Sequence, residues 1–111
     1  MEMRKVLCDT MTELMSQNDN IVFMDADLAE ANGTMPLRKM FPERAFDTGI
    51  SEQNMASMAA GMSAYGMNPY ICTFTAFSTR RICDQIAISM SYAKQNIKII
   101  GTDAGIASEL N

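Results

Sequence analysis

The fold is decided by a short apolar stretch that ends in acidic residues, IVFMDAD at residues 21–27. A continuous apolar run of this length is typical of a strand that is buried on both faces of a parallel sheet. Similar short runs occur at residues 69–73 (PYICT) and 97–101 (IKIIG), and residues 44–47 (RAFD) are expected to form a smaller strand. The sequence therefore predicts several short strands in one sheet.

Helical patterns lie between these strands. Apolar side chains recur at helical spacing in three segments, 3–17, 52–65 and 79–94, and a short helical turn is expected at 36–40. Loops are expected at 30–34, 74–78 and 102–111. Because helices alternate with strands, the chain is predicted to be an α/β domain with a largely parallel sheet. It ends soon after the last expected strand, so we expect residues 1–111 to be one incomplete domain.

The clearest helix begins after Ser51, whose hydroxyl can cap it, and ends at Gly66. One of its faces consists of small side chains, Ala56, Ala60 and Ser63. Small side chains permit close approach of another element. This face is therefore a candidate contact surface, although it could equally pack on the sheet.

Composition excludes several classes of protein. The 111 residues are 48% hydrophobic and 20% charged, which is ordinary for one globular domain. No apolar run approaches the roughly 18 residues of a membrane span, and the N-terminus has no signal-peptide pattern. A net charge of −4 without a long basic tract argues against nucleic acid as the main partner.

The chain contains no histidine, which excludes an imidazole acid or base and any histidine metal site within it. The three cysteines, Cys8, Cys72 and Cys83, have no metal-binding spacing and are odd in number. We interpret them as reduced, mostly buried thiols of a cytoplasmic protein. The twelve methionines are interpreted as adaptable core side chains.

Polar and aromatic residues follow the expected strands, where ligands bind in open parallel sheets. They are Asp25, Asp27, the turn at residues 49–52, the TFTAF stretch at residues 73–77, and the pair Thr102 and Asp103. Asp25 and Asp27 alone are a weak metal motif and could simply cap a turn. The sequence predicts a binding site at this edge but no metal site.

Each candidate residue can be interpreted either as structural or as part of a binding site. Glu52 lies in the first turn of its helix, where a carboxylate is stabilised by the helix dipole, or it could hydrogen-bond a bound heterocycle. Phe74 and Phe77 could fill the core or enclose a flat ring. Arg80 and Arg81 have the wrong sign for a helix N-terminus, so they are either solvated or close to a carboxylate or phosphate.

Four stretches, in their order and spacing, resemble the pyrimidine-binding domain of transketolases: DADL at residues 25–28, FPER at 41–44, DTGISEQNM at 47–55 and TFTAF at 73–77. The resemblance covers essentially the whole chain. It implies the three-layer thiamine-diphosphate-binding fold, with helices on both faces of a largely parallel sheet. It also suggests the C-terminal subunit of a split transketolase.

The resemblance implies a role for each site residue. Glu52 matches the glutamate that hydrogen-bonds the pyrimidine N1′ of thiamine diphosphate and promotes its imino tautomer. Phe74 and Phe77 match the aromatics that pack on the aminopyrimidine ring, and Asp27 matches an acidic residue near the thiazolium. Arg4 has the spacing from Asp27 of an arginine that binds the sugar phosphate.

Three positions depart from the family pattern. Arg80 stands where transketolases often have a tyrosine that lines the pyrimidine pocket, so it becomes a candidate cofactor-binding residue. Thr102 replaces a histidine that contacts phosphate, and Ala31 replaces a serine. The stretch TDAG at residues 102–105 is more similar to deoxyxylulose-phosphate synthases. These changes concern the substrate more than the cofactor.

The resemblance also implies partners. The diphosphate and its magnesium are held in this family by a separate domain with a GDG motif, which this chain lacks. We therefore expect a diphosphate-binding domain or subunit, a second protomer in a dimer, and an isolated chain without activity. The expected reaction transfers a two-carbon ketol unit between sugar phosphates. The alternatives are an enzyme like deoxyxylulose-phosphate synthase and a non-catalytic assembly domain.

Overall fold

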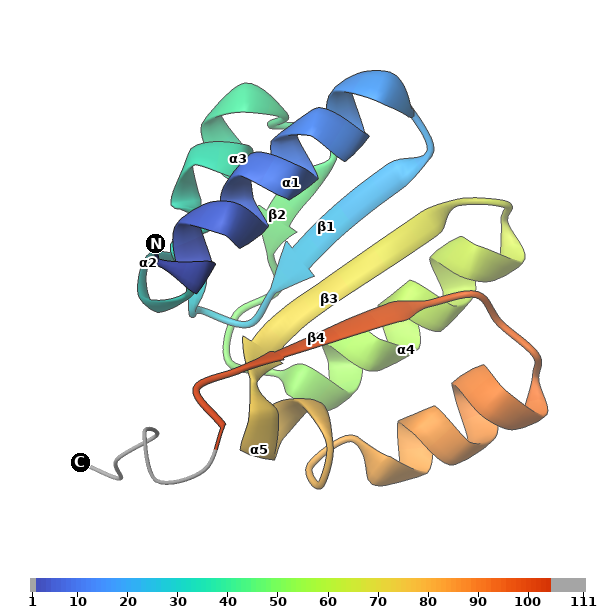
Figure 1. Cartoon of the computed structure of the whole chain (residues 1–111). Coiled ribbons are helices and arrows are strands. Elements are labelled where there is room, and N and C mark those ends of the chain that lie inside the picture. Colours follow the sequence, from blue (N-terminus) through green and yellow to red (C-terminus); the bar gives the residue numbers. More distant parts are fainter. Residues whose placement is uncertain (1, 105–111) are drawn as a thin grey trace.

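The computed structural model describes residues 2–104, which form one four-stranded sheet (Figure 1). Its strands are β1 (Ile21–Asp25), β2 (Ala45–Asp47), β3 (Asn68–Phe74) and β4 (Lys98–Thr102). They lie in the order β2-β1-β3-β4, and every neighbouring pair is parallel. The predicted α/β fold with a parallel sheet is confirmed.

Helices cover both faces of the sheet (Figure 1). On one face lie α1 (Met3–Gln17), α2 (Ala29–Asn32) and α3 (Met35–Met40), and on the other lie α4 (Glu52–Ala64) and the π-helix Gln85–Tyr92. A single turn, α5 (Thr75–Ser78), follows β3 directly. No helix within residues 2–104 is long and apolar enough to cross a membrane.

Alternate residues of β1 divide the core into two halves. Phe23 packs with Met11 and Met15 of α1, whereas Met24 packs with Met55 of α4 on the other face. All five side chains are at most 2% exposed. Burial on both faces is the reason why this strand is an unbroken apolar run. These four methionines fill the core as expected, whereas Met3, Met40 and Met67 are exposed.

Four local expectations were wrong. Residues 29–32 and 75–78 form single helical turns where loops were expected, and Gly33, with φ of 75°, ends the first of them. A periodicity cannot be recognised within four residues. The segment 79–94 is not one α-helix, because its second half has the wider π-helical turn, with Gln95 N–H donating to the carbonyl of Met90 at 2.8 Å. The Ser51 hydroxyl donates to the Thr48 carbonyl at 2.9 Å instead of capping α4.

Other expectations concern residues that pack within the chain or lie outside its described part. Ala56 and Ala60 of the small-residue face are buried, and the Ser63 hydroxyl accepts a hydrogen bond from Asn96 N–H at 2.8 Å. This face therefore packs within the domain. Residues 105–111 of the expected C-terminal loop lie outside the described residues.

Gly101 of β4 brings α5 close to the sheet, and its replacement by alanine is expected to be destabilising. An added Cβ would lie 2.9 Å from the Thr75 and Ser78 hydroxyl oxygens and 3.3 Å from Thr75 Cα. We expect Gly101→Ala to lower the free energy of unfolding by about 1–3 kcal/mol, as overpacking does. Urea unfolding measures this change. Gly61→Ala is the control, because nothing lies within 4 Å of a Cβ added there, and alanine within α4 should keep or raise the stability by up to about 1 kcal/mol. A Gly101→Ala variant as stable as wild type would show that α5 moves away freely.

Candidate functional site

The carboxyl ends of the parallel strands meet at one edge of the sheet. In the register of the sheet, Asp25 lies opposite both Asp47 and Cys72, and Phe74 lies opposite Thr102. The segments that follow these strands therefore adjoin one another, as the sequence predicted. The turns after β1, β2 and β3 supply the site residues on this edge.

Glu52 is the first residue of α4, and its carboxylate is buried, with 4% exposure. The N-terminus of α4 offers unpaired backbone N–H groups and a favourable dipole for a negative charge. The ion-pair partner of Glu52 is Arg81, whose Nη1 donates to Glu52 Oε1 at 3.0 Å. A buried carboxylate at the ligand-binding edge of a sheet is poised to hydrogen-bond a polar ligand.

Phe74 and Phe77 form a nearly parallel pair that Arg81 links to this carboxylate. Their ring centroids are 6.0 Å apart, with an interplanar angle of 22°. Both side chains are only partly buried, so neither is a core residue. The Arg81 guanidinium lies over the Phe77 ring, 4.2 Å from its centroid. Arg81 thus joins Phe77 and Glu52 into one cluster.

The structure distinguishes the two neighbouring arginines. Arg80 is exposed, and within residues 2–104 it makes no ion pair or side-chain hydrogen bond. Its assignment to the cofactor stays a prediction. Arg81 is the arginine that contacts Glu52 and Phe77. The sequence could not separate them, because residues 79–82 form an irregular turn with no helical phase.

Asp47 was overlooked as a site residue and fixes the turns on which Asp27 and Glu52 lie. Its Oδ1 accepts hydrogen bonds from Asp27 N–H at 2.7 Å and Gly49 N–H at 2.8 Å. Asp27 has a φ of 63° and Gly49 a φ of 80°, so both turns are left-handed at these residues. An aspartate followed two residues later by glycine is a turn signal that could have indicated this role.

A second cluster of polar side chains involves α2 and the ends of β1 and β4. Thr102 Oγ1 donates to Asn32 Oδ1 at 2.6 Å, and Leu28 N–H donates to Asp25 Oδ1 at 3.2 Å. Burial raises the pKa of the Asp25 carboxyl, and the neighbouring Asp47 adds to this effect. Thr102 therefore connects the end of β4 to α2.

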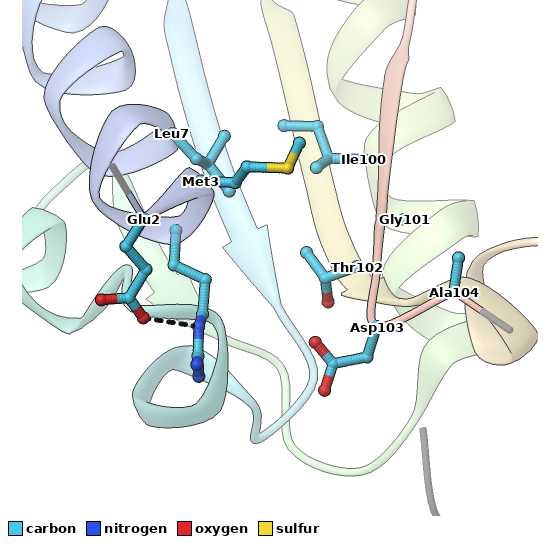
Figure 2. Close-up of a pocket in the computed structure, with 9 residues that line it drawn as sticks. Glu2, Met3, Leu7, Ile100, Gly101, Thr102, Asp103 and Ala104 are labelled. Atoms are coloured by element: carbon cyan, nitrogen blue, oxygen red, sulfur yellow. Dashed lines mark ion pairs between the residues drawn. The ribbon is translucent and has the colours of Figure 1, made fainter. Parts of the chain in front are cut away.

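Arg4 lies at a separate cavity of about 500 Å³ between the start of α1 and the end of β4 (Figure 2). Its Nη1 donates to the Ala31 carbonyl at 2.9 Å, and its Nε is 3.1 Å from Glu2 Oε1. Figure 2 shows Thr102 and Asp103 on the β4 side of this cavity. The structure thus brings Arg4 together with Ala31 and near Thr102, the positions at which the sequence departs from the family.

The three cysteines are free, and two of them are buried. Burial raises the pKa of the Cys72 thiol to about 12, and that of Cys8 is raised for the same reason. Cys83 is exposed, so the set is mostly buried, as the sequence predicted. Within residues 2–104, no three His, Cys, Asp or Glu side chains gather where they could hold a metal ion.

A family model and several known proteins match this chain. The family model described as "transketolase, pyrimidine binding domain" matches residues 1–110. The 6-deoxy-6-sulfo-D-fructose transketolase subunit SqwH of Clostridium sp. (strain MSTE9) is 42% identical over 109 residues, which are 98% of this chain and 34% of that protein. The 1-deoxy-D-xylulose-5-phosphate synthase of Clostridium acetobutylicum is 33% identical over 105 residues, 95% of this chain and 17% of the enzyme.

A solved structure supports the same assignment. The structure described as a split gene transketolase, inactive beta4 tetramer, matches with a TM-score of 0.79 and 40% identity over 88% of this chain and 33% of its own. The chain thus spans about a third of the transketolase subunits that it matches and less of the synthase. Because the family model matches nearly every residue, this chain belongs to the transketolase pyrimidine-binding domain family.

Proposed function

We propose that this chain supplies the pyrimidine half of a thiamine-diphosphate site in a transketolase complex, which transfers a two-carbon ketol unit between sugar phosphates. The supporting observation is the buried Glu52 carboxylate, which Arg81 links to a pair of partly exposed phenylalanines. An aminopyrimidine is flat, largely apolar on its faces and rich in nitrogen at its edge. The phenylalanine pair offers apolar surface to a face of that ring, and the Glu52 carboxylate can share a proton with its N1′ atom.

In this proposal each residue has one task. Glu52 hydrogen-bonds N1′ and holds the proton that passes between the carboxylate and the ring. Phe74 and Phe77 pack on the ring and exclude water from it. Asp27 lies at the edge near the thiazolium, Arg80 lies near the cofactor, and Arg4 binds the anionic end of the sugar. When bound, thiamine diphosphate supplies the carbon nucleophile that accepts the two-carbon unit.

The diphosphate and its magnesium are assigned to a partner. Residues 2–104 form no metal-binding group, and the net charge of −4 on the 111 residues does not favour a diphosphate. We therefore propose a complex with a diphosphate-binding domain or subunit and a second protomer, in the cytoplasm, and we expect the isolated chain to be inactive. Split subunits among the relatives support this arrangement.

The donor substrate distinguishes the proposed function from its alternative. We expect the complete subunit, mixed with its diphosphate-binding partner, thiamine diphosphate and magnesium, to transfer a ketol unit from a ketose phosphate to an aldose phosphate. A coupled assay of the released aldose measures this reaction. A 6-deoxy-6-sulfo ketose serves as a second donor, because a relative is named for that sugar.

Two other results would replace this proposal. Product from pyruvate and glyceraldehyde phosphate, with no transfer from ketoses, would select the synthase reaction, for which a 33% identical relative is known. A complex that binds neither donor nor cofactor would support a non-catalytic assembly domain. Activity that requires the partner, and is absent from this chain alone, is the expected outcome.

A further inference from the structure

Arg81 is the charged side chain at the site to which the family resemblance gives no task. It comes from the irregular turn between α5 and the π-helix, 29 residues after Glu52. Its side chain is 48% exposed, whereas its partner Glu52 is 4% exposed. A half-exposed cation that pairs with a buried carboxylate is held in place by specific contacts.

Three contacts fix Arg81. Its Nη1 donates to Glu52 Oε1 at 3.0 Å, and its guanidinium lies over the Phe77 ring, 4.2 Å from the centroid. Its backbone carbonyl accepts a hydrogen bond from Gln53 Nε2 at 3.2 Å, so the turn is also tied to α4. Guanidinium stacking on an aromatic face restrains the plane of the donors, which a lysine ammonium cannot do.

The two carboxylate oxygens of Glu52 are consequently not equivalent. Oε1 accepts the hydrogen bond from Arg81, and within residues 2–104 Oε2 accepts none from another side chain or from the backbone. A charge-assisted hydrogen bond to one oxygen fixes the rotamer of the whole carboxylate. Oε2 is left to share a proton with a ligand atom that is not part of this chain.

We propose that Arg81 is a positioning residue, which holds Glu52 by Oε1 so that Oε2 is presented to the pyrimidine N1′. This inference rests on the proposed cofactor site. Phe77 then has two partners, the cofactor ring and the Arg81 guanidinium, and it links the orientation of the carboxylate to that of the ring. Arg81 acts through Glu52 and needs no contact of its own with the substrate.

The test uses the complete subunit in complex with its diphosphate-binding partner. One rate and one affinity are compared for each variant. The rate is the exchange of the cofactor C2 proton for deuterium, followed by NMR. The affinity is the dissociation constant of thiamine diphosphate with magnesium, measured by calorimetry. We expect Arg81→Met to slow exchange about tenfold to a hundredfold, as loss of an outer hydrogen-bond partner does. The dissociation constant should change by less than about threefold, since the ring contacts remain. Arg81→Lys keeps the charge and should recover part of the rate.

The control is Lys39→Met on α3, which removes one positive charge from an exposed position on the opposite face of the sheet. It should leave both quantities unchanged. If Arg81 acts through Glu52, the variant with both Arg81→Met and Glu52→Gln should exchange no more slowly than Glu52→Gln alone. Additive losses would overturn the inference.

Other outcomes separate this inference from the function on which it rests. Normal exchange in Arg81→Met, or tighter cofactor binding by that variant, would show that the ring displaces Arg81 and would overturn the positioning role. The proposed cofactor site would survive either result. A wild-type complex that binds no thiamine diphosphate would instead overturn the proposed function, and the inference with it.

Discussion

Glu52→Gln is expected to slow exchange of the cofactor C2 proton by about 10²–10⁴-fold, the usual contribution of a positioned acid or base. A glutamine amide can still accept a hydrogen bond from Arg81, but it cannot accept or release a proton at the ring. The fold should be retained, because the substitution keeps the shape of the side chain at the N-terminus of α4. Deuterium exchange in the reconstituted complex measures the effect, with ketol transfer as a second readout.

The matched control is Glu13→Gln, an exposed glutamate of α1 on the other face of the sheet. It loses the same charge far from the edge and should exchange at the wild-type rate. Calorimetry must show that Glu52→Gln still binds the cofactor, because only then can slow exchange be attributed to lost proton transfer and not to lost binding. Exchange at the wild-type rate in this variant would remove Glu52 from the mechanism and leave a binding role alone.

The strands and long helices could be predicted because their patterns are long enough to recognise. The run at residues 21–24 is buried on both faces, and α1 and α4 place methionines at helical spacing against β1. The turns α2 and α5 have four residues each and gave no such pattern. The π-helix was expected as an α-helix, because eight residues with one buried side chain, Met90, have too little periodicity to distinguish the two forms.

The site was predictable at the level of its edge and less so at the level of its contacts. Parallel strands bring Asp25, Asp47 and Phe74 to one edge whatever their side chains do. The choice of Arg81 over Arg80 depends on the local turn after α5, and the role of Asp47 depends on two left-handed residues in neighbouring turns. Neither has a periodic signal in the sequence.

Phe77→Ala is expected to weaken binding of thiamine diphosphate to the complex by about 5- to 150-fold. Stacking of an aromatic side chain on a heterocyclic base contributes about 1–3 kcal/mol, and this free energy corresponds to that range of affinity. The truncation also removes the surface on which the Arg81 guanidinium lies. Calorimetric titration of the cofactor with magnesium measures the dissociation constant.

Two companion variants make this prediction specific. Phe77→Leu keeps apolar bulk but loses the flat face, so its affinity should lie between those of Phe77→Ala and wild type. Phe41→Ala removes a partly buried ring from the opposite half of the core, where loss of stability is expected without loss of cofactor affinity. If Phe77→Ala binds the cofactor as tightly as wild type, Phe77 stabilises the fold or the position of Arg81 and does not contribute to cofactor binding. The cofactor ring would then have to pack on Phe74, whose ring centroid is 6.0 Å from that of Phe77.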